Sequence, residues 1–372
     1  MRWLLVRITM GLMQLGAKEI YALTSIRFFA AALVVWEHLP MLPGLEWMGV
    51  PGNCTGRAGV IIFFVLSGFI MSYTYGDRDW SGRFGGNARE FYWSRFARIY
   101  PLHWLMFLFA LPLGLNSNTA RVSVSDFPWQ LTLTDMLWPG HAAGAQPVKA
   151  AWTLSCEVLF YLLTPVFFLA LNGKKRPLTV SVILLLGTTA GILTLIALFP
   201  GGHWLAYEYL PEFLLGIAGF QLTRRVNLSR AGSGLLVVGG VFLVVAVMAN
   251  LSRPCRFAQL YYAPGALLVI LGCANAAGRM GRFLALPPLV LLGHASYSLY
   301  LLHDPVLRYL KVLLNRKGIV LSFPGNILIA AVVFGGIITA SILCFKYYEN
   351  PVRLKLRSLL KPDIKSPVGA RT

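Results

Sequence analysis

Two ionisable side chains, Arg27 and His38, lie in one apolar stretch of the sequence, which runs from Ala22 to Leu39. Their separation is about three turns of an α-helix, so both project from one face, roughly 16 Å apart along its axis. A guanidinium can hold an anion or a carbonyl group, and an imidazole can accept a proton, so the pair suits proton transfer on a bound substrate. The alternative is structural: each side chain reaches the nearer membrane interface.

Two further spacings place chemically useful groups together. Arg95 and Arg98 are three residues apart, so on a helix they form a cationic face suited to bidentate binding of phosphate. A basic membrane anchor within an aromatic belt is the alternative. Glu157 and Tyr161 share a helical face, and a carboxylate beside an apolar span is rarely idle. Glu157 could orient a histidine, bind a sugar hydroxyl, or pair with an arginine such as Arg27.

Weaker candidates follow along the chain. Ser67 and Gly68 favour close helix packing, and Ser67 is a poor nucleophile candidate because no base adjoins it. His294 and His303 are equally compatible with a polar tunnel and with satisfied interior histidines. Glu349 could pair with a cytoplasmic arginine. The sequence around His303 also contains a stripe of polar side chains, namely Ser296, Tyr297, Tyr300 and Asp304.

These residues must be positioned by membrane helices. The chain has 372 residues, of which 57% are hydrophobic and 13% charged, and its mean hydropathy is +0.65. Such a chain is too apolar for an ordinary soluble domain. We therefore predict an all-α, polytopic transmembrane helical bundle. Apolar runs of spanning length indicate about ten spans, near residues 22–40, 58–75, 99–115, 153–171, 178–199, 206–222, 233–251, 259–274, 289–312 and 325–346.

The distribution of basic residues predicts the orientation of these spans. An even number of spans places both termini on one side. With a cytoplasmic N-terminus, 23 of the 33 Lys and Arg residues are cytoplasmic, as the positive-inside rule requires. We expect an N-terminal cytoplasmic or interfacial segment over 1–20, a transmembrane domain over 21–353 and a basic cytoplasmic tail over 354–372. The net charge of +19 then reflects topology, and a nucleic-acid partner is not expected.

Several other features are not expected. The Cys and His residues show no metal-site spacing, so no metal is predicted, although Cys54 and Cys255 in external loops could form a disulfide. The first residues lack a cleavage site for a signal peptide. No internal repeat is apparent, which weakens a transporter interpretation built on inverted halves.

In chain order, the motifs resemble those of the acyltransferase-3 family, integral-membrane enzymes that modify bacterial surface glycans. The matching motifs are R-x10-H at Arg27 and His38, FFVLSGF at Phe63 to Phe69, R-x-x-R at Arg95 and Arg98, W-x-L-x-x-E-x-x-F-Y at Trp152 to Tyr161, S-Y-x-x-Y-x-x-H at Ser296 to His303, and Y-x-E-x-P at Tyr347 to Pro351. One departure is Ile61, where the family often has an acidic residue.

The resemblance implies about ten helices in the bacterial cytoplasmic (inner) membrane, with membrane lipids as surroundings. It implies acyl-CoA, usually acetyl-CoA, as the cytoplasmic co-substrate. The acceptor would be a hydroxyl of a surface glycan or lipid-linked oligosaccharide on the other side. Some relatives carry a C-terminal esterase-like SGNH domain, and this chain is expected to be the stand-alone form without it.

The motifs and the resemblance together suggest a mechanism. We expect Arg95 and Arg98 to bind the CoA phosphates, while Arg27 orients the donor and His38 acts as general base on the acceptor hydroxyl. Glu157 would assist His38 or the acceptor. The side chains expected to contact substrate are Trp152, Ser155, Tyr161, Tyr300 and His303.

Three alternatives remain open at this point. His38 or another side chain could carry the acyl group covalently in a relay across the membrane. The chain could instead transport an anionic solute, with Arg27 as the substrate anchor. It could also be a structural partner in a glycan-assembly complex, in which case Arg27, His38 and Arg95 would tolerate substitution.

Overall fold

The computed structural model describes residues 19–49, 54–78, 80, 87–115, 123–137, 146–171, 174, 176–198, 205–252, 259–320 and 325–360, and all of its regular structure in these ranges is helical. The longer helices are α2 (Tyr21–His38), α3 (Cys54–Tyr75), α4 (Asn87–Leu115), α6 (Trp152–Leu171), α7 (Pro177–Leu198), α9 (Leu210–Thr223), α10 (Gly232–Ser252), α11 (Gln259–Ala274), α14 (Ser296–Arg316) and α15 (Gly325–Cys344). The shorter ones are α5 (Phe127–Leu131), α8 (Leu205–Glu208), α12 (Gly278–Leu284), α13 (Pro287–His294) and α16 (Asn350–Ser358). The predicted all-α class is confirmed.

Each of the ten expected spans coincides with one or two of these helices. Within the described ranges, seven helices are long and apolar enough to cross a membrane, or eight if α11 and α12, which meet at a 97° bend, form one broken span. The remaining two expected spans, which contain α9 and α14, do not meet these requirements of length and apolarity, and each has a physical reason. The 14 residues of α9 reach only about 21 Å, and α14 carries buried polar side chains such as His303 and Asp304. The chain is a polytopic helical membrane protein.

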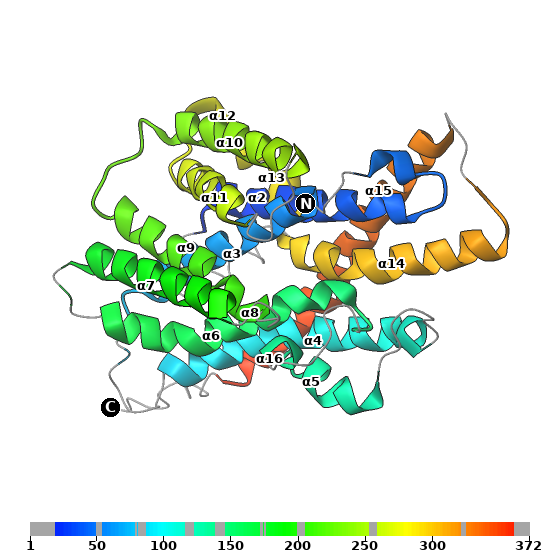
Figure 1. Cartoon of the computed structure of the whole chain (residues 1–372), viewed down its shortest axis with the longest axis horizontal. Helices are drawn as coiled ribbons and strands as arrows, with labels where there is room; N and C mark the ends of the chain where they lie inside the picture. The colour runs from blue at the N-terminus through cyan, green and yellow to red at the C-terminus, as the bar shows by residue number, and fades with distance from the viewer. Residues whose placement is uncertain are drawn as a thin grey trace, which may run out of the picture.

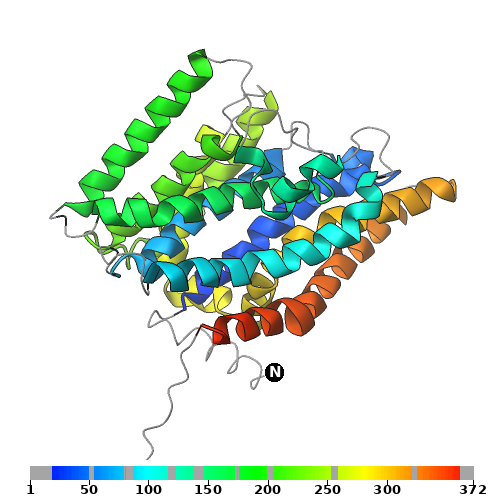
Figure 2. The ribbon, with the colours of Figure 1, turned by 90° about the horizontal axis from the view of Figure 1, so that it is seen from below.

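Helices α2 and α3 lie at the centre of the bundle. Figure 1 shows them between α10 and α11 on one side and α4 and α6 on the other. Most of α3 is buried, whereas α7, α10 and α15 expose most of their apolar surface, as helices facing lipid would. In Figure 2, α7 (green) stands at the edge of the molecule. The central pair therefore provides the interior surface on which a polar site can be built.

Close packing of α3 against α9 depends on two glycines. A Cβ atom at Gly68 would overlap the carbonyl oxygen of Phe213, and one at Gly216 would overlap that of Val65. Only hydrogen at these positions lets the two backbones approach so closely. The FFVLSGF stretch therefore has the architectural role that its small residues indicated.

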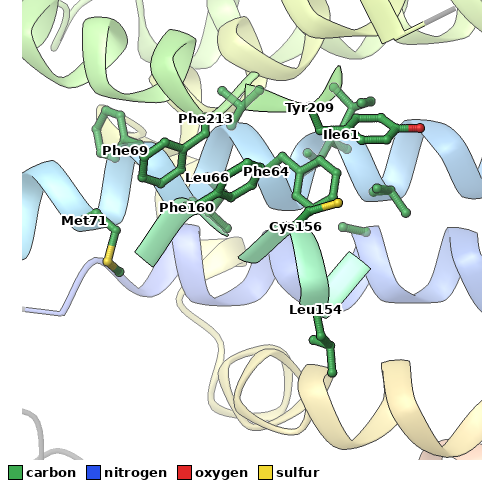
Figure 3. Close-up of a cluster of buried hydrophobic side chains, with 14 of the residues drawn as sticks. Ile61, Phe64, Leu66, Phe69, Met71, Leu154, Cys156, Phe160, Tyr209 and Phe213 are labelled. Atoms are coloured by element: carbon green, nitrogen blue, oxygen red, sulfur yellow. The ribbon is translucent and has the colours of Figure 1, made fainter. Parts of the chain in front are cut away.

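Aromatic side chains fill the space around α3. The Phe64 ring lies 5.3 Å from Phe160 and 5.1 Å from Tyr209, measured between centroids, and Figure 3 shows these rings packed together. Ile61, at the position where the family often has an acidic residue, is fully buried in this hydrophobic cluster. No carboxylate role can be assigned to it.

Two ion pairs join segments that were all predicted to be cytoplasmic. Arg224, after α9, pairs with Asp77 after α3 at 2.5 Å, and Arg78 pairs with Glu90 of α4 at 3.2 Å. The ends of α3 and α9 and the start of α4 therefore lie together. The predicted boundary between residues 353 and 354 falls inside α16. Cys255 lies outside the described residues, so its predicted pairing with Cys54 is not addressed.

Candidate active site

A pocket of about 440 Å³, here called the inner pocket, lies among α2, α3, α4, α6 and α14. Its apolar lining comes from α3, including Phe63 and Phe64, and from Leu154. Phe64 and Leu154 appear in Figure 3 on neighbouring elements. Its polar lining consists of Arg27, Arg98, Thr153, Glu157, Ser296, Tyr297 and Tyr300. The predicted residues Arg27, Arg98, Glu157 and Tyr300 thus meet in one place.

A second pocket of about 950 Å³, here called the outer pocket, adjoins the first. Arg27 and Arg98 line both pockets, so the two volumes meet at these guanidinium groups. The charged lining of the outer pocket consists of Glu19, Arg27, Arg95, Arg98, Glu349 and Arg353, with His294 beside them. Its wall on α3 runs from Ile70 to Thr74, which lies next to the segments predicted to be cytoplasmic. A phosphate-bearing donor entering from that side would meet several cations.

Arg27 and Arg98 line both pockets, and their donors are not occupied by the neighbouring side chains that the structure describes. Within the described parts of the chain, neither guanidinium makes a hydrogen bond or an ion pair with another residue. The nearby carboxylate of Glu157 instead accepts a hydrogen bond of 3.0 Å from the Tyr161 hydroxyl. The two cations are therefore available to an anionic or carbonyl-bearing substrate.

Arg95 has a different environment from Arg98. Its guanidinium carbon lies 5.4 Å, 5.8 Å and 5.6 Å from the ring centroids of Tyr75, Phe91 and Tyr161. It also donates a hydrogen bond of 3.0 Å to the Tyr75 hydroxyl. Cation–π contacts of this kind fix a guanidinium in place. Arg95 lines the outer pocket, but much of its bonding capacity serves the protein itself.

His38 lies at the far end of α2 and lines neither of these two pockets. Its Nδ1 atom lies 2.7 Å from the Val34 carbonyl oxygen. A carbonyl only accepts, so Nδ1 carries the proton and Nε2 is left as a base. The His38 ring is 5.0 Å from the His303 ring, which is 5.9 Å from that of Tyr300 in the wall of the inner pocket. His38 is therefore two ring contacts away from that pocket.

His303 is fully buried, and neither ring nitrogen has a hydrogen-bond partner among the described residues. A buried polar group without a partner is costly unless a ligand or water satisfies it. Its neighbour Tyr300 is better satisfied, because the Tyr300 hydroxyl lies 2.8 Å from the Thr153 hydroxyl, which donates to it. His303 is thus available for a polar contact beside His38.

Trp152 and Ser155 were predicted to contact substrate, but neither lines the pockets described above. The Trp152 ring packs 5.4 Å from that of Tyr209. The buried Ser155 hydroxyl donates a hydrogen bond of 2.9 Å to Asp135. Burial raises the pKa of Asp135, although hydrogen bonds from Gln146 and Ser155 oppose that rise. These contacts hold the segment around Asp135, which was predicted to be external, against α6.

Arg353 was not among the residues predicted for the site, and Glu349 was expected only to pair with an arginine. Both line the outer pocket. The Y-x-E-x-P motif was the available signal, because it precedes Arg353 by two residues. Within the described ranges, no three His, Cys, Asp or Glu side chains are grouped in a way that could hold a metal ion.

Comparison with known proteins identifies the family. The acyltransferase domain model of the acyltransferase-3 family matches residues 20–346. Acyltransferase MdmB of Streptomyces mycarofaciens is 29% identical over 324 residues, covering 77% of this chain and 79% of MdmB. Exopolysaccharide production protein ExoZ of Rhizobium meliloti (strain 1021) is 30% identical over 263 residues, covering 67% of this chain and 75% of ExoZ.

Peptidoglycan O-acetyltransferase OatA of Listeria monocytogenes is 23% identical over 364 residues, covering 90% of this chain but only 56% of OatA. No solved structure matches the chain. The matched enzymes favour group transfer over the transporter and purely structural alternatives. With its family motifs gathered at two joined pockets in a helical membrane bundle, the chain belongs to the acyltransferase-3 family and is a membrane acyltransferase.

Proposed function

We propose that this enzyme moves an acetyl group from cytoplasmic acetyl-CoA to a hydroxyl of a cell-surface or lipid-linked polysaccharide, in the bacterial cytoplasmic membrane. The relatives named as exopolysaccharide and peptidoglycan proteins support a glycan acceptor, and the O-acetyltransferases among them support an acetyl donor. The large cationic outer pocket suits the phosphates of CoA.

One observation carries the proposal: α2, α3 and α14 all run along the line that leads from the outer pocket through the inner pocket toward His38. Glu19, just before α2, lines the outer pocket, Arg27 of α2 lines both pockets, and His38 lies beyond them at the end of the helix. Helix α3 runs the opposite way, from Thr74 in the outer pocket to Val60 in the inner pocket. Helix α14 continues from Ser296 and Tyr300 in the inner pocket to His303. A donor entering at the outer pocket therefore extends toward His38.

The chemical step uses the groups on this route. The acceptor oxygen attacks the thioester carbonyl carbon while Nε2 of His38 takes the hydroxyl proton. The carbon–sulfur bond then breaks, and the CoA thiolate leaves and takes up a proton. Arg27, roughly 16 Å from His38 along α2, binds the donor and orients its thioester toward His38. Glu157 accepts a hydrogen bond from Tyr161 and assists in orienting Arg27 within the inner pocket.

Two routes between the inner pocket and His38 are compatible with this arrangement. In direct transfer, movement of the Tyr300 ring lets the thioester reach His38. In a relay, a side chain of the enzyme carries the acetyl group between the two places. Incubation of the purified enzyme with labelled acetyl-CoA but no acceptor separates them. Labelled protein indicates the relay, and unlabelled protein from an active preparation indicates direct transfer.

The function itself is tested in cells and with purified protein. Mass spectrometry of surface polysaccharide is compared between cells with the wild-type protein, without it, and with His38→Ala. We expect acetyl groups only with the wild type, because loss of a general base lowers the rate on the order of 10²- to 10⁴-fold. Equal acetylation with and without the protein would contradict the proposal. Size-exclusion chromatography in detergent controls for folding of the variant.

A further inference from the structure

The outer pocket contains a cation that the family motifs did not indicate. Arg353 enters it from α16, and Arg95 enters it from α4. In the described walls of this pocket, four arginines face two carboxylates, those of Glu19 and Glu349. The pocket therefore has a surplus of positive charge that includes Arg353.

The two carboxylates already have partners other than Arg353. Glu19 lies 3.2 Å from Nε2 of His294 and accepts a hydrogen bond of 2.7 Å from Thr24. Glu349 accepts a hydrogen bond of 2.6 Å from the Ser298 hydroxyl of α14. Burial raises the pKa of Glu19, but interactions with His294, Thr24 and Arg27 together lower it overall.

Arg353 is left with an unused donor. Its Nη2 atom donates a hydrogen bond of 2.7 Å to the side chain of Asn350. Its buried Nε atom has no hydrogen-bond partner in the described part of the chain. A buried donor without a partner is costly unless a water, an ion or a ligand satisfies it. An anion would satisfy both the donor and the surplus charge.

The position of Arg353 is fixed from outside the pocket. The Trp93 indole of α4 donates a hydrogen bond of 2.7 Å to the Leu356 carbonyl oxygen of α16. Tyr348 donates one of 3.1 Å to the Pro101 carbonyl oxygen of α4. A π-helical turn, η7 (Phe345–Glu349), precedes α16, and such turns are frequent at functional sites. α16 is therefore a firmly attached wall, and Arg353 is held in place for a ligand.

The depth of each arginine decides which part of the donor it meets. Arg27 and Arg98 line both pockets, whereas Arg95 and Arg353 line only the outer one. In CoA, the pyrophosphate joins the pantetheine arm, while the 3′-phosphate on the ribose lies farthest from the thioester. With the thioester directed inward, we propose that Arg353 binds the 3′-phosphate of the donor, an inference that rests on the proposed use of acetyl-CoA.

The test compares two donors and two variants in purified enzyme. The donors are acetyl-CoA and acetyl-dephospho-CoA, which lacks only the 3′-phosphate. The variants are Arg353→Gln and Lys355→Gln, a matched control on the same helix whose exposed side chain lines neither pocket. We expect Arg353→Gln to raise KM for acetyl-CoA about 10- to 100-fold, as loss of a charged hydrogen bond does. Its kcat and its KM for acetyl-dephospho-CoA should stay near the wild-type values.

The remaining outcomes have distinct meanings. Wild-type enzyme and Lys355→Gln should prefer acetyl-CoA, and Arg353→Lys should restore part of that preference because it keeps the charge. An equal rise in KM for both donors in Arg353→Gln, or no rise for either, would overturn the inference. If the wild-type enzyme transfers nothing from acetyl-CoA, the proposed function itself fails. A comparison of inhibition by 3′,5′-ADP and by 5′-ADP gives a second readout, with the difference expected in the wild type and Lys355→Gln but not in Arg353→Gln.

Discussion

Arg95 and Arg98 belong to one motif but have different surroundings. Arg98 lines both pockets and has no hydrogen bond to another described residue, whereas Arg95 is bonded to Tyr75 and enclosed by aromatic rings. The spacing in the sequence predicts a shared cationic face, but it gives no information about which guanidinium has free donors. The structure therefore predicts different consequences for the two substitutions.

Arg98→Gln should weaken donor binding without loss of stability. We expect KM for acetyl-CoA to rise about 10- to 100-fold because a charged contact is lost, with an unchanged melting temperature in detergent. Arg95→Gln should in addition lower stability by about 1–2 kcal/mol, because it removes a hydrogen bond and cation–π contacts. Thermal unfolding and donor titrations measure both effects. Equal melting temperatures for the two variants would contradict this distinction.

Glu157 lines the inner pocket, and its carboxylate accepts a hydrogen bond from Tyr161, which lines neither of the two pockets. Tyr161→Phe removes only the hydroxyl, so we expect a loss of about 1 kcal/mol, or roughly fivefold, in kcat/KM. Glu157→Gln removes the negative charge near Arg27 and should cost more, on the order of 10²-fold. Steady-state kinetics with acetyl-CoA decide the order. A larger loss in Tyr161→Phe than in Glu157→Gln would contradict the assignment of Glu157 to the site.

At the scale of elements, the crossing of α3 and α9 positions the wall of the inner pocket. Gly68→Ala should force the two backbones apart and destabilise the protein by about 1–3 kcal/mol or more. Gly187→Ala is the matched control, because a Cβ there meets nothing within 4 Å. We expect the yield of monodisperse protein in detergent to fall for Gly68→Ala only. Normal behaviour of both variants would contradict the importance of this close approach.

The sequence predicted the helical elements well but not their interruptions. Long apolar runs set the position of a membrane helix, which is why all ten expected spans coincide with helices. The 97° bend after α11 and the π-helical turn before α16 depend on packing between distant segments, which apolar patterning does not report. Ser155 is a similar case. It was predicted to contact substrate, but its hydroxyl donates a hydrogen bond to Asp135, a contact between distant segments that the sequence pattern does not report.

At the scale of the whole molecule, the orientation in the membrane is a prediction from charge. In a variant without the native cysteines, Ser229→Cys should lie in the cytoplasm and Ser125→Cys outside, and both positions are exposed. An impermeant maleimide added to intact cells should then label only the cysteine at position 125. Inverted membrane vesicles should show the opposite pattern. Labelling of position 229 in intact cells would reverse the proposed direction of donor entry.

Much of the site was predictable because several of its residues belong to sequence motifs. Arg27, Glu157 and Tyr300 come from α2, α6 and α14 and meet in the inner pocket, as their motifs and the family resemblance implied. Arg353 was missed because its place in the outer pocket depends on how α16 packs against α4. A position after the last apolar run carries no periodic signal for such a contact.

The rings of Tyr300, His303 and His38, which follow one another beyond the inner pocket, have a consequence for the energy supply of the cell. A water-filled channel at this place would let protons flow down their electrochemical gradient and dissipate the proton-motive force. The rings instead meet edge-on or tilted. If the proposed transfer takes place across them, it needs no open channel, and the enzyme would then leave the gradient that drives ATP synthesis intact.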